Sequence, residues 1–162
     1  MSNDRAVINA SPLITLCKSG QEDLLPRLFR ELVVPVAVWE EIEAGGADDV
    51  AAQKLPSLTW LRRDASMASS PVVQSWDLGA GETAVLSFAH DDPEYVAVVD
   101  DAAARRCASG LNIRVIGTLG LIVLAKRRGI IQSVAPGLRA LKEAGLWISD
   151  DFVARLIAQE DS

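Results

Sequence analysis

The sequence predicts an α/β fold built on a mostly parallel five-stranded sheet with helices on both faces. Short apolar runs alternate with longer segments of helical character, which is typical of strands joined by helices. One run, Tyr95–Val99, is apolar at five consecutive positions, as expected of a strand that is buried on both faces. The length of 162 residues and the hydrophobic fraction of 49% suit a single domain over residues 1–162.

Five strands are expected from the apolar runs. They cover Val7–Ile8, Leu32–Val34, Leu58–Leu61, Val96–Val99 and Ile113–Ile116. Because parallel neighbours need a crossover connection, the helix-like segments between these runs are expected to carry the chain from one strand to the next.

Capping residues mark the first two predicted helices. Ser11 is expected to cap the first helix, with Pro12 at its first position. Pro35 opens another helix, which stops at the glycine pair that begins with Gly45.

The second half of the chain is expected to contain four longer helices. Gly79–Gly81 is a flexible lead-in to an amphipathic helix and does not fit the glycine loops that bind nucleotide phosphates. Residues 118–128, 133–144 and 149–157 form the others. Residues 64–75 are serine-rich and are expected to be a surface crossing, with a flap or linker as the alternative.

The charge balance limits how this chain could bind nucleic acid. A formal net charge of −6 weighs against broad electrostatic binding to phosphates. A local basic rim stays open, because Arg105 and Arg106 follow two aspartates and Lys126–Arg128 closes a later helix. The alternative is that these are solvated charges at helix ends.

The cysteines and the apolar segments indicate a reducing, membrane-free environment. Cys17 and Cys107 lie between apolar neighbours and are expected to be buried thiols. No apolar stretch is long enough to span a bilayer, and the first residues lack the layout of a signal peptide. We therefore expect a cytoplasmic protein with no membrane contact.

Two carboxylates come directly after the buried run. Asp100 and Asp101 are expected at the carboxyl end of that strand, the edge of an open α/β sheet where ligands bind. One of them could simply cap the following helix, since acids favour a helix N-terminus. The presence of the second aspartate then needs an explanation other than capping.

Further oxygen ligands are predicted at the same edge. Asn9 ends the first strand, Glu41 lies early in the helix after the second strand, and Glu82 begins the helix that leads to the fourth strand. With Asp100 and Asp101 they would form an oxygen-rich pocket suited to Mg²⁺ or Mn²⁺. Carboxylates packed together repel one another, so a bound divalent cation would explain the arrangement.

These polar residues also have plainer interpretations. Asn9 could hold a turn through its side chain, Glu41 could be solvated, and Glu82 could serve only the helix dipole. Glu40 would point elsewhere than Glu41, because neighbours on a helix face different directions. Thr118 is expected to cap its helix.

The histidine and the tryptophans favour no second kind of site. His90, the only histidine, is expected at the surface, and with no nucleophile elbow a Ser-His-acid site is not supported. The tryptophans are expected to pack in the core or between subunits rather than to stack on bases. They are Trp39, Trp60, Trp76 and Trp147.

Five short blocks of sequence, spread over nearly the whole chain, form one joint pattern. They are residues 9–14 (Asn-Ala-Ser-Pro-Leu-Ile), 34–42, 78–84, 99–106 and 115–120. In this order they resemble the PIN-domain family of metal-dependent ribonucleases. The first block is similar to the branch, DUF3368-like, in which the first strand ends in Asn-x-Ser-Pro-Leu-Ile.

The resemblance implies a three-layer fold and an acidic pocket that binds Mg²⁺ or Mn²⁺ and cleaves single-stranded RNA. It implies metal ligands at Asn9, Glu41, Glu82, Asp100 and Asp101, the last three being catalytic. It implies substrate contacts at Ser11, Arg105, Arg106 and Thr118. The match favours Asp101 as the fourth ligand by its distance to Arg105, but the sequence alone does not separate Asp101 from Asp100. It also implies a homodimer and the toxin of a toxin–antitoxin pair, held inactive by a cognate antitoxin.

One departure from the family pattern leaves alternatives open. Asn9 stands where the family usually has aspartate, so the first ligand is neutral and coordinates Mg²⁺ more weakly. A catalytically impaired regulatory module that binds nucleic acid or protein is therefore the main alternative. A phosphohydrolase acting on small molecules is a third.

Overall fold

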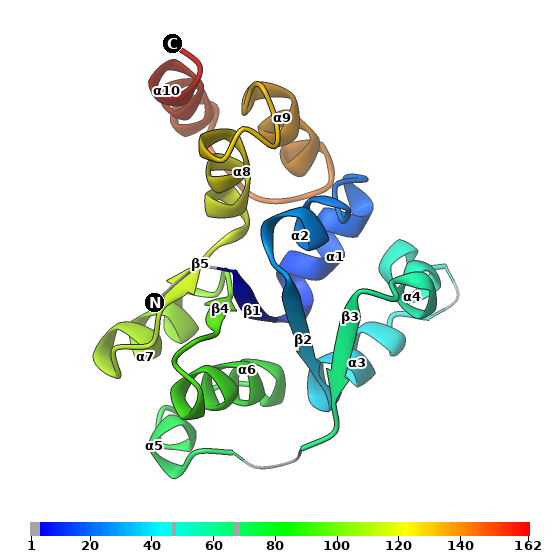
Figure 1. Ribbon diagram of the computed structural model, residues 1–162, viewed down its shortest axis with the longest axis vertical. Helices are drawn as coiled ribbons and strands as arrows, with labels where there is room; N and C mark the ends of the chain where they lie inside the picture. The colour runs from blue at the N-terminus through cyan, green and yellow to red at the C-terminus, as the bar shows by residue number, and fades with distance from the viewer. Residues whose placement is uncertain (1–3, 47, 67–68) are drawn as a thin grey trace.

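The computed structural model describes residues 4–46, 48–66 and 69–162, and it contains a five-stranded, all-parallel sheet in the order β3-β2-β1-β4-β5 (Figure 1). The strands are β1 (Arg5–Ile8), β2 (Glu31–Pro35), β3 (Leu61–Asp64), β4 (Val96–Val98) and β5 (Val115–Ile116). The predicted α/β class and the parallel sheet are confirmed. The central strands are buried along almost their whole length, which explains why they read as continuous apolar runs.

The strand order determines which face of the sheet each helix covers. The chain moves from β1 to β2 to β3 in one direction, then returns across the sheet to β4 and β5. Right-handed crossovers in opposite directions place their helices on opposite faces, which gives three layers. The helices are α1 (Ala10–Lys18), α2 (Leu24–Leu28), α3 (Val36–Glu43), α4 (Val50–Lys54), α5 (Pro71–Gln74), α6 (Ala80–Asp91), α7 (Ala102–Gly110), α8 (Thr118–Arg127), α9 (Ala135–Glu143) and α10 (Asp150–Glu160).

The third strand was predicted three residues too early. Leu58 is buried, but its N–H donates to the carbonyl of Leu55 in a turn that closes a 3₁₀ helix over Leu55–Ser57. The strand itself begins at Leu61 and carries Arg62 and Arg63, both exposed. β3 is an edge strand, where charged residues are tolerated, so its sequence lacks the apolar signal of the central strands.

The segment 64–75 is more ordered than a plain surface crossing. Asp64 still pairs with Pro35 of β2, and Pro71–Gln74 form the short helix α5. The N–H of Ser70 donates to the Oγ atom of Ser87 on α6 at 3.0 Å. Residues 67 and 68 of this segment lie outside the described residues.

The first helix begins at Ala10, so the predicted cap at Ser11 is wrong. Ser11 is an exposed residue inside α1, and its carbonyl accepts a hydrogen bond from the Thr15 hydroxyl at 2.9 Å. Asn9 occupies the N-cap position, yet its side chain makes no capping hydrogen bond.

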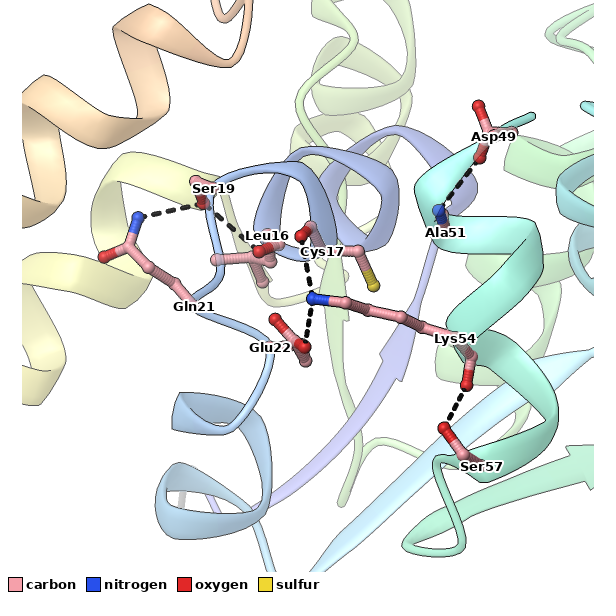
Figure 2. Close-up of polar contacts among 9 residues, drawn as sticks. All are labelled: Leu16, Cys17, Ser19, Gln21, Glu22, Asp49, Ala51, Lys54 and Ser57. Atoms are coloured by element: carbon pink, nitrogen blue, oxygen red, sulfur yellow. Dashed lines mark hydrogen bonds and ion pairs between the residues drawn. The ribbon is translucent and has the colours of Figure 1, made fainter.

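Buried contacts join α1 to α4 on one side of the sheet. Lys54 of α4 reaches across to Glu22, at 2.6 Å, and to the carbonyl of Cys17 at the end of α1 (Figure 2). The Cys17 thiol is buried, and burial raises its pKa to about 11. Cys107 is likewise free and buried, so the prediction of two buried thiols is confirmed.

Within the part of the chain that the structure describes, no helix is long and apolar enough to cross a membrane.

Candidate active site

Two of the polar residues at the carboxyl edge of the sheet follow the adjacent strands β1 and β4. Ile8 of β1 pairs with Val98 of β4, and the N–H of Asn9 donates to the carbonyl of Val98 at 3.0 Å. Asn9 and Asp100 thus follow adjacent strands. The chain leaves β1 toward β2 and leaves β4 toward β5, so the helices that follow diverge to opposite faces. This reversal opens the crevice in which such sheets bind ligands.

The side-chain oxygen of Asn9 is buried and unpaired. Asn9 is 3% exposed, and its Oδ1 atom has no hydrogen-bond partner among the described residues. A buried acceptor without a partner costs roughly 1–3 kcal/mol. The turn-holding interpretation of Asn9 does not account for this atom, because that role requires the oxygen to accept a hydrogen bond. A cation would satisfy it.

Gly81 is the place where Asn9 and Glu41 meet. A Cβ atom at position 81 would lie 3.0 Å from Asn9 Oδ1 and 3.0 Å from Glu41 Oε1. The two oxygens therefore flank the same backbone position at the start of α6, and a side chain there would have to displace them. The sequence-based interpretation of Gly79–Gly81 as only a flexible lead-in missed this close approach.

Glu41 and Glu82 bring two negative charges to the same place. Glu41 is exposed, in agreement with the solvated interpretation, yet the partial burial of its carboxyl first, and the charge of Glu82 second, raise the pKa of that carboxyl above its ordinary value. Glu82 lies in the first turn of α6, next to Gly81, and its Oε2 atom is 2.7 Å from the position of a Cβ on Gly79. No three His, Cys, Asp or Glu side chains in residues 4–46, 48–66 and 69–162 are close enough to hold a metal as a ready-made cluster. The amide of Asn9 with two repelling carboxylates nevertheless fits a hard divalent cation, because oxygen atoms are its preferred ligands.

Asp100 and Asp101 have different partners. Both oxygens of Asp100 are held by Thr118 of α8: Oδ1 accepts from the backbone N–H at 2.7 Å and Oδ2 from the hydroxyl at 2.6 Å. Asp101 is exposed and caps α7, accepting from the N–H of Ala104 at 2.9 Å. Helix capping therefore accounts for Asp101, and capping by one of the two aspartates was one interpretation of the sequence. Gly117, not Thr118, is the N-cap of α8, so the predicted capping role of Thr118 is wrong.

Of the two predicted arginines, Arg105 lies beside Asp100. Its Nη1 atom donates to the carbonyl of Val99 at 3.3 Å. A Cβ on Gly117 would lie 2.8 Å from that atom and 3.0 Å from Asp100 Oδ1. Arg106 is exposed one position further along α7, about 100° around the helix from Arg105.

Two cavities flank this edge of the sheet. One, of about 260 Å³, lies at the end of β2 and is lined by Pro35, Ala37 and Thr83 among others. The other, of about 480 Å³, lies at the ends of β4 and β5 and is lined by Asp100 and Arg105 among others. Because β1 lies between β2 and β4, the two cavities are on opposite sides of Asn9.

The predictions for His90 and Trp147 can also be compared with the structure. His90 is half-buried at the far end of α6 from Glu82, so it is less exposed than the predicted surface residue. Trp147 is 94% exposed, so it does not pack in the core of this chain, and its predicted packing between subunits stays a prediction. It lines the same cavity as Asp100 and Arg105.

Replacing Glu41 by glutamine is expected to stabilise the metal-free protein. A carboxyl whose pKa is raised on folding costs stability as the pH rises from its ordinary value of 4.5 through the raised value. Because Glu41 is exposed and solvent screens its repulsion with Glu82, Glu41→Gln should raise the melting temperature by about 1 °C at most above that interval, and below it the difference should vanish. Thermal unfolding in the presence of a chelator, from pH 4 to pH 8, measures this. Glu40→Gln, an exposed neighbour on the same helix, is the matched control. A lower melting temperature for Glu41→Gln at pH 8 would contradict the repulsion.

Comparison with known proteins identifies the family of this chain. A family model, DUF3368, described as a PIN domain, matches residues 5–162, which contain every residue of the candidate site. A comparison with curated proteins found no match. The family match covers nearly the whole chain, and the chain belongs to the PIN-domain family.

Proposed function

We propose that this protein is a divalent-metal-dependent ribonuclease that cleaves single-stranded RNA. PIN domains are generally nucleases, and the proposal for this chain depends above all on one observation. The buried, unpaired Oδ1 atom of Asn9 faces Glu41 across Gly81, at the topological reversal of the sheet. A structural asparagine would have a hydrogen-bond partner there.

The proposed ligands of Mg²⁺ or Mn²⁺ are Asn9, Glu41, Glu82 and Asp100, with Asp101 at the rim. When bound, the ion supplies a Lewis acid that polarises the phosphodiester and activates water. Thr118 is a positioning residue, because its N–H and hydroxyl fix both oxygens of Asp100. Glu82 and Asp100 add the negative charge that Asn9 lacks.

Arginine side chains supply the proposed contacts to RNA. Arg105 lies beside Asp100 and presents a guanidinium that can donate two hydrogen bonds to one phosphate. Arg106 and Ser11 are exposed on α7 and α1 and would contact the RNA chain further from the acids. The proposal includes a homodimer and a cognate antitoxin, on the family resemblance alone, and a cytoplasmic location, as expected from the sequence.

A second candidate function is a regulatory module that keeps the PIN fold and has lost catalysis. Two observations favour it. Asn9 is neutral where the family usually has aspartate, and the described residues contain no group of three acidic, histidine or cysteine side chains placed to hold a metal. On this alternative the protein would bind nucleic acid or another protein without cleaving it.

Metal titration with an RNA assay tests the proposal. Mg²⁺ and Mn²⁺ are titrated into chelator-treated protein by calorimetry, and cleavage of single-stranded RNA is followed with and without the ion. We expect binding of the ion and cleavage that a chelator abolishes. The same measurements on the Asp100→Ala, Asp101→Ala double variant control for contaminating nuclease. Binding without cleavage would support the regulatory module, and no binding would overturn the metal site.

A further inference from the structure

Trp147 is the most exposed large apolar side chain described in this protein. Its side chain is 94% exposed, against 42% for Trp76 and 39% for Phe152. It lies between α9 and α10, two residues after Gly145, whose φ of +107° turns the chain in a way that other residues rarely adopt. An indole held in solvent loses the favourable burial of its apolar surface, so an occupant that covers it would be stabilised.

The position of Trp147 connects it to the acidic edge. It lines the cavity of about 480 Å³ that also contains Asp100 and Arg105. That volume is within the roughly 300–1,000 Å³ of typical small-ligand sites. Gly117 forms the floor between the two charged groups, since a Cβ there would lie 2.8 Å from Arg105 Nη1 and 3.0 Å from Asp100 Oδ1. We name this hollow the tryptophan groove.

From these positions we infer that the tryptophan groove is a base-binding subsite for single-stranded RNA. Trp147 stacks on a base, and Arg105 contacts the phosphate between that base and the acidic edge. This inference deepens the proposed function and depends on it for the identity of the polymer. It goes beyond that function in naming a residue that recognises a base next to the cleavage site.

The chemistry of the groove favours RNA over a protein partner. The groove contains an exposed aromatic ring and a guanidinium among mostly apolar lining residues, and these two kinds of group can bind successive nucleotides, one taking a base and the other a phosphate. Only one N–H of Arg105 is used by the Val99 carbonyl, and a guanidinium carries five. The groove is continuous with Asp100, so its occupant extends to the site of the proposed chemistry.

The second cavity leaves room for a polymer that extends past the acidic edge. It lies on the other side of Asn9, lined by Pro35 and by Ala80 and Thr83 of α6. An endonuclease holds the chain on both sides of the bond that it cleaves. Hollows on both sides of the acidic edge provide room for this, whereas a mononucleotide would need only one.

Fluorescence binding with matched tryptophan variants tests the subsite. The background is Glu82→Gln, which is expected to slow cleavage because Glu82 is a proposed metal ligand, and which does not line the groove. A short single-stranded oligoribonucleotide is titrated into this protein, into Trp147→Ala and Trp147→Phe derivatives, and into a Trp76→Ala control. Trp76 is exposed and packs against Gly110 of α7. A ribose-phosphate chain of the same length without bases is the second ligand.

We expect tryptophan emission to fall on binding, and Trp147→Ala to remove most of that change. Trp147→Ala should weaken binding about fivefold to a hundredfold, the range that one base stack contributes. Trp147→Phe should retain most of the affinity and Trp76→Ala all of it. Binding of the chain without bases should not depend on position 147.

Other outcomes separate this inference from the proposed function. Equal RNA binding by Trp147→Ala and the parent would overturn the subsite, even if the unsubstituted protein cleaves RNA. Unchanged RNA binding with a dimer that dissociates in Trp147→Ala would assign the groove to a protein interface, which also overturns it. Binding that depends on Trp147 in a protein that never cleaves would retain the subsite and reject the ribonuclease.

Discussion

Replacing Asn9 by aspartate is expected to strengthen Mg²⁺ binding at least about tenfold and to destabilise the metal-free protein. The side chain is 3% exposed and its Oδ1 atom faces Glu41 across Gly81, so the new charge is buried beside an existing one. A unit charge a few ångströms from a divalent cation is worth more than the roughly 1.4 kcal/mol that corresponds to tenfold affinity. Without metal, the same charge should cost about 1–3 kcal/mol of unfolding free energy.

Two measurements on the same variant check this expectation. Calorimetric titration gives the metal affinity, and denaturant unfolding with a chelator gives the stability. Asn112→Asp is the control, because Asn112 is exposed after α7 and its new charge is solvated. RNA cleavage by Asn9→Asp alone, with none by the parent, would establish the regulatory-module alternative. Unchanged metal affinity would show that Asn9 is not a ligand.

Replacing Asp100 by asparagine is expected to reduce RNA cleavage at least about a hundredfold, while Asp101→Asn leaves it nearly unchanged. Outer-shell partners of metal ligands are already worth 10–100-fold, so loss of a ligand charge should exceed that. Asparagine at position 100 can still accept from the N–H of Thr118 and face its hydroxyl. Asparagine at position 101 caps a helix as well as aspartate does.

This pair of variants is matched, since both remove one charge and keep the size of the side chain. Cleavage rates and melting temperatures of both are measured with the same RNA. A larger loss of cleavage in Asp101→Asn would reverse the assignment and make the capping aspartate the ligand. Equal cleavage by both variants and the parent would remove the aspartate pair from the mechanism.

The buried parts of the fold could be predicted from the sequence, and the edge strand could not. β1, β2 and β4 are enclosed by helices, so their positions require apolar residues and the pattern is readable. β3 lies at the sheet edge, where the exposed residues Arg62 and Arg63 can occupy strand positions. Its sequence therefore has no continuous apolar run. Leu58 lies three residues before the strand, is buried, and directly follows the 3₁₀ helix. The apolar run that begins at Leu58 was therefore mistaken for the strand.

The site could be predicted as a set of residue types but not as a set of contacts. Strand ends locate Asn9 and Asp100 in sequence, because neighbouring parallel strands end at one edge. The approach of Glu41 to Asn9 depends on how α3 packs against α6, which Gly81 permits by having no side chain. The contact between Thr118 and Asp100 joins a residue that precedes β5 in the sequence to one that follows it. No local sequence pattern predicts this contact.

The pairing of Ile8 with Val98 also has a consequence for how the protein is made. The two strands that carry Asn9 and Asp100 are separated by the whole of β2, β3 and α6, so the ribosome must complete most of the chain before they can pair. Contacts between such distant segments form late in folding, since closing a long loop comes first. An N-terminal fragment that ends before β4 therefore cannot bring Asn9 and Asp100 together. If the protein is a ribonuclease, its synthesis must pass β4 before the proposed site can exist.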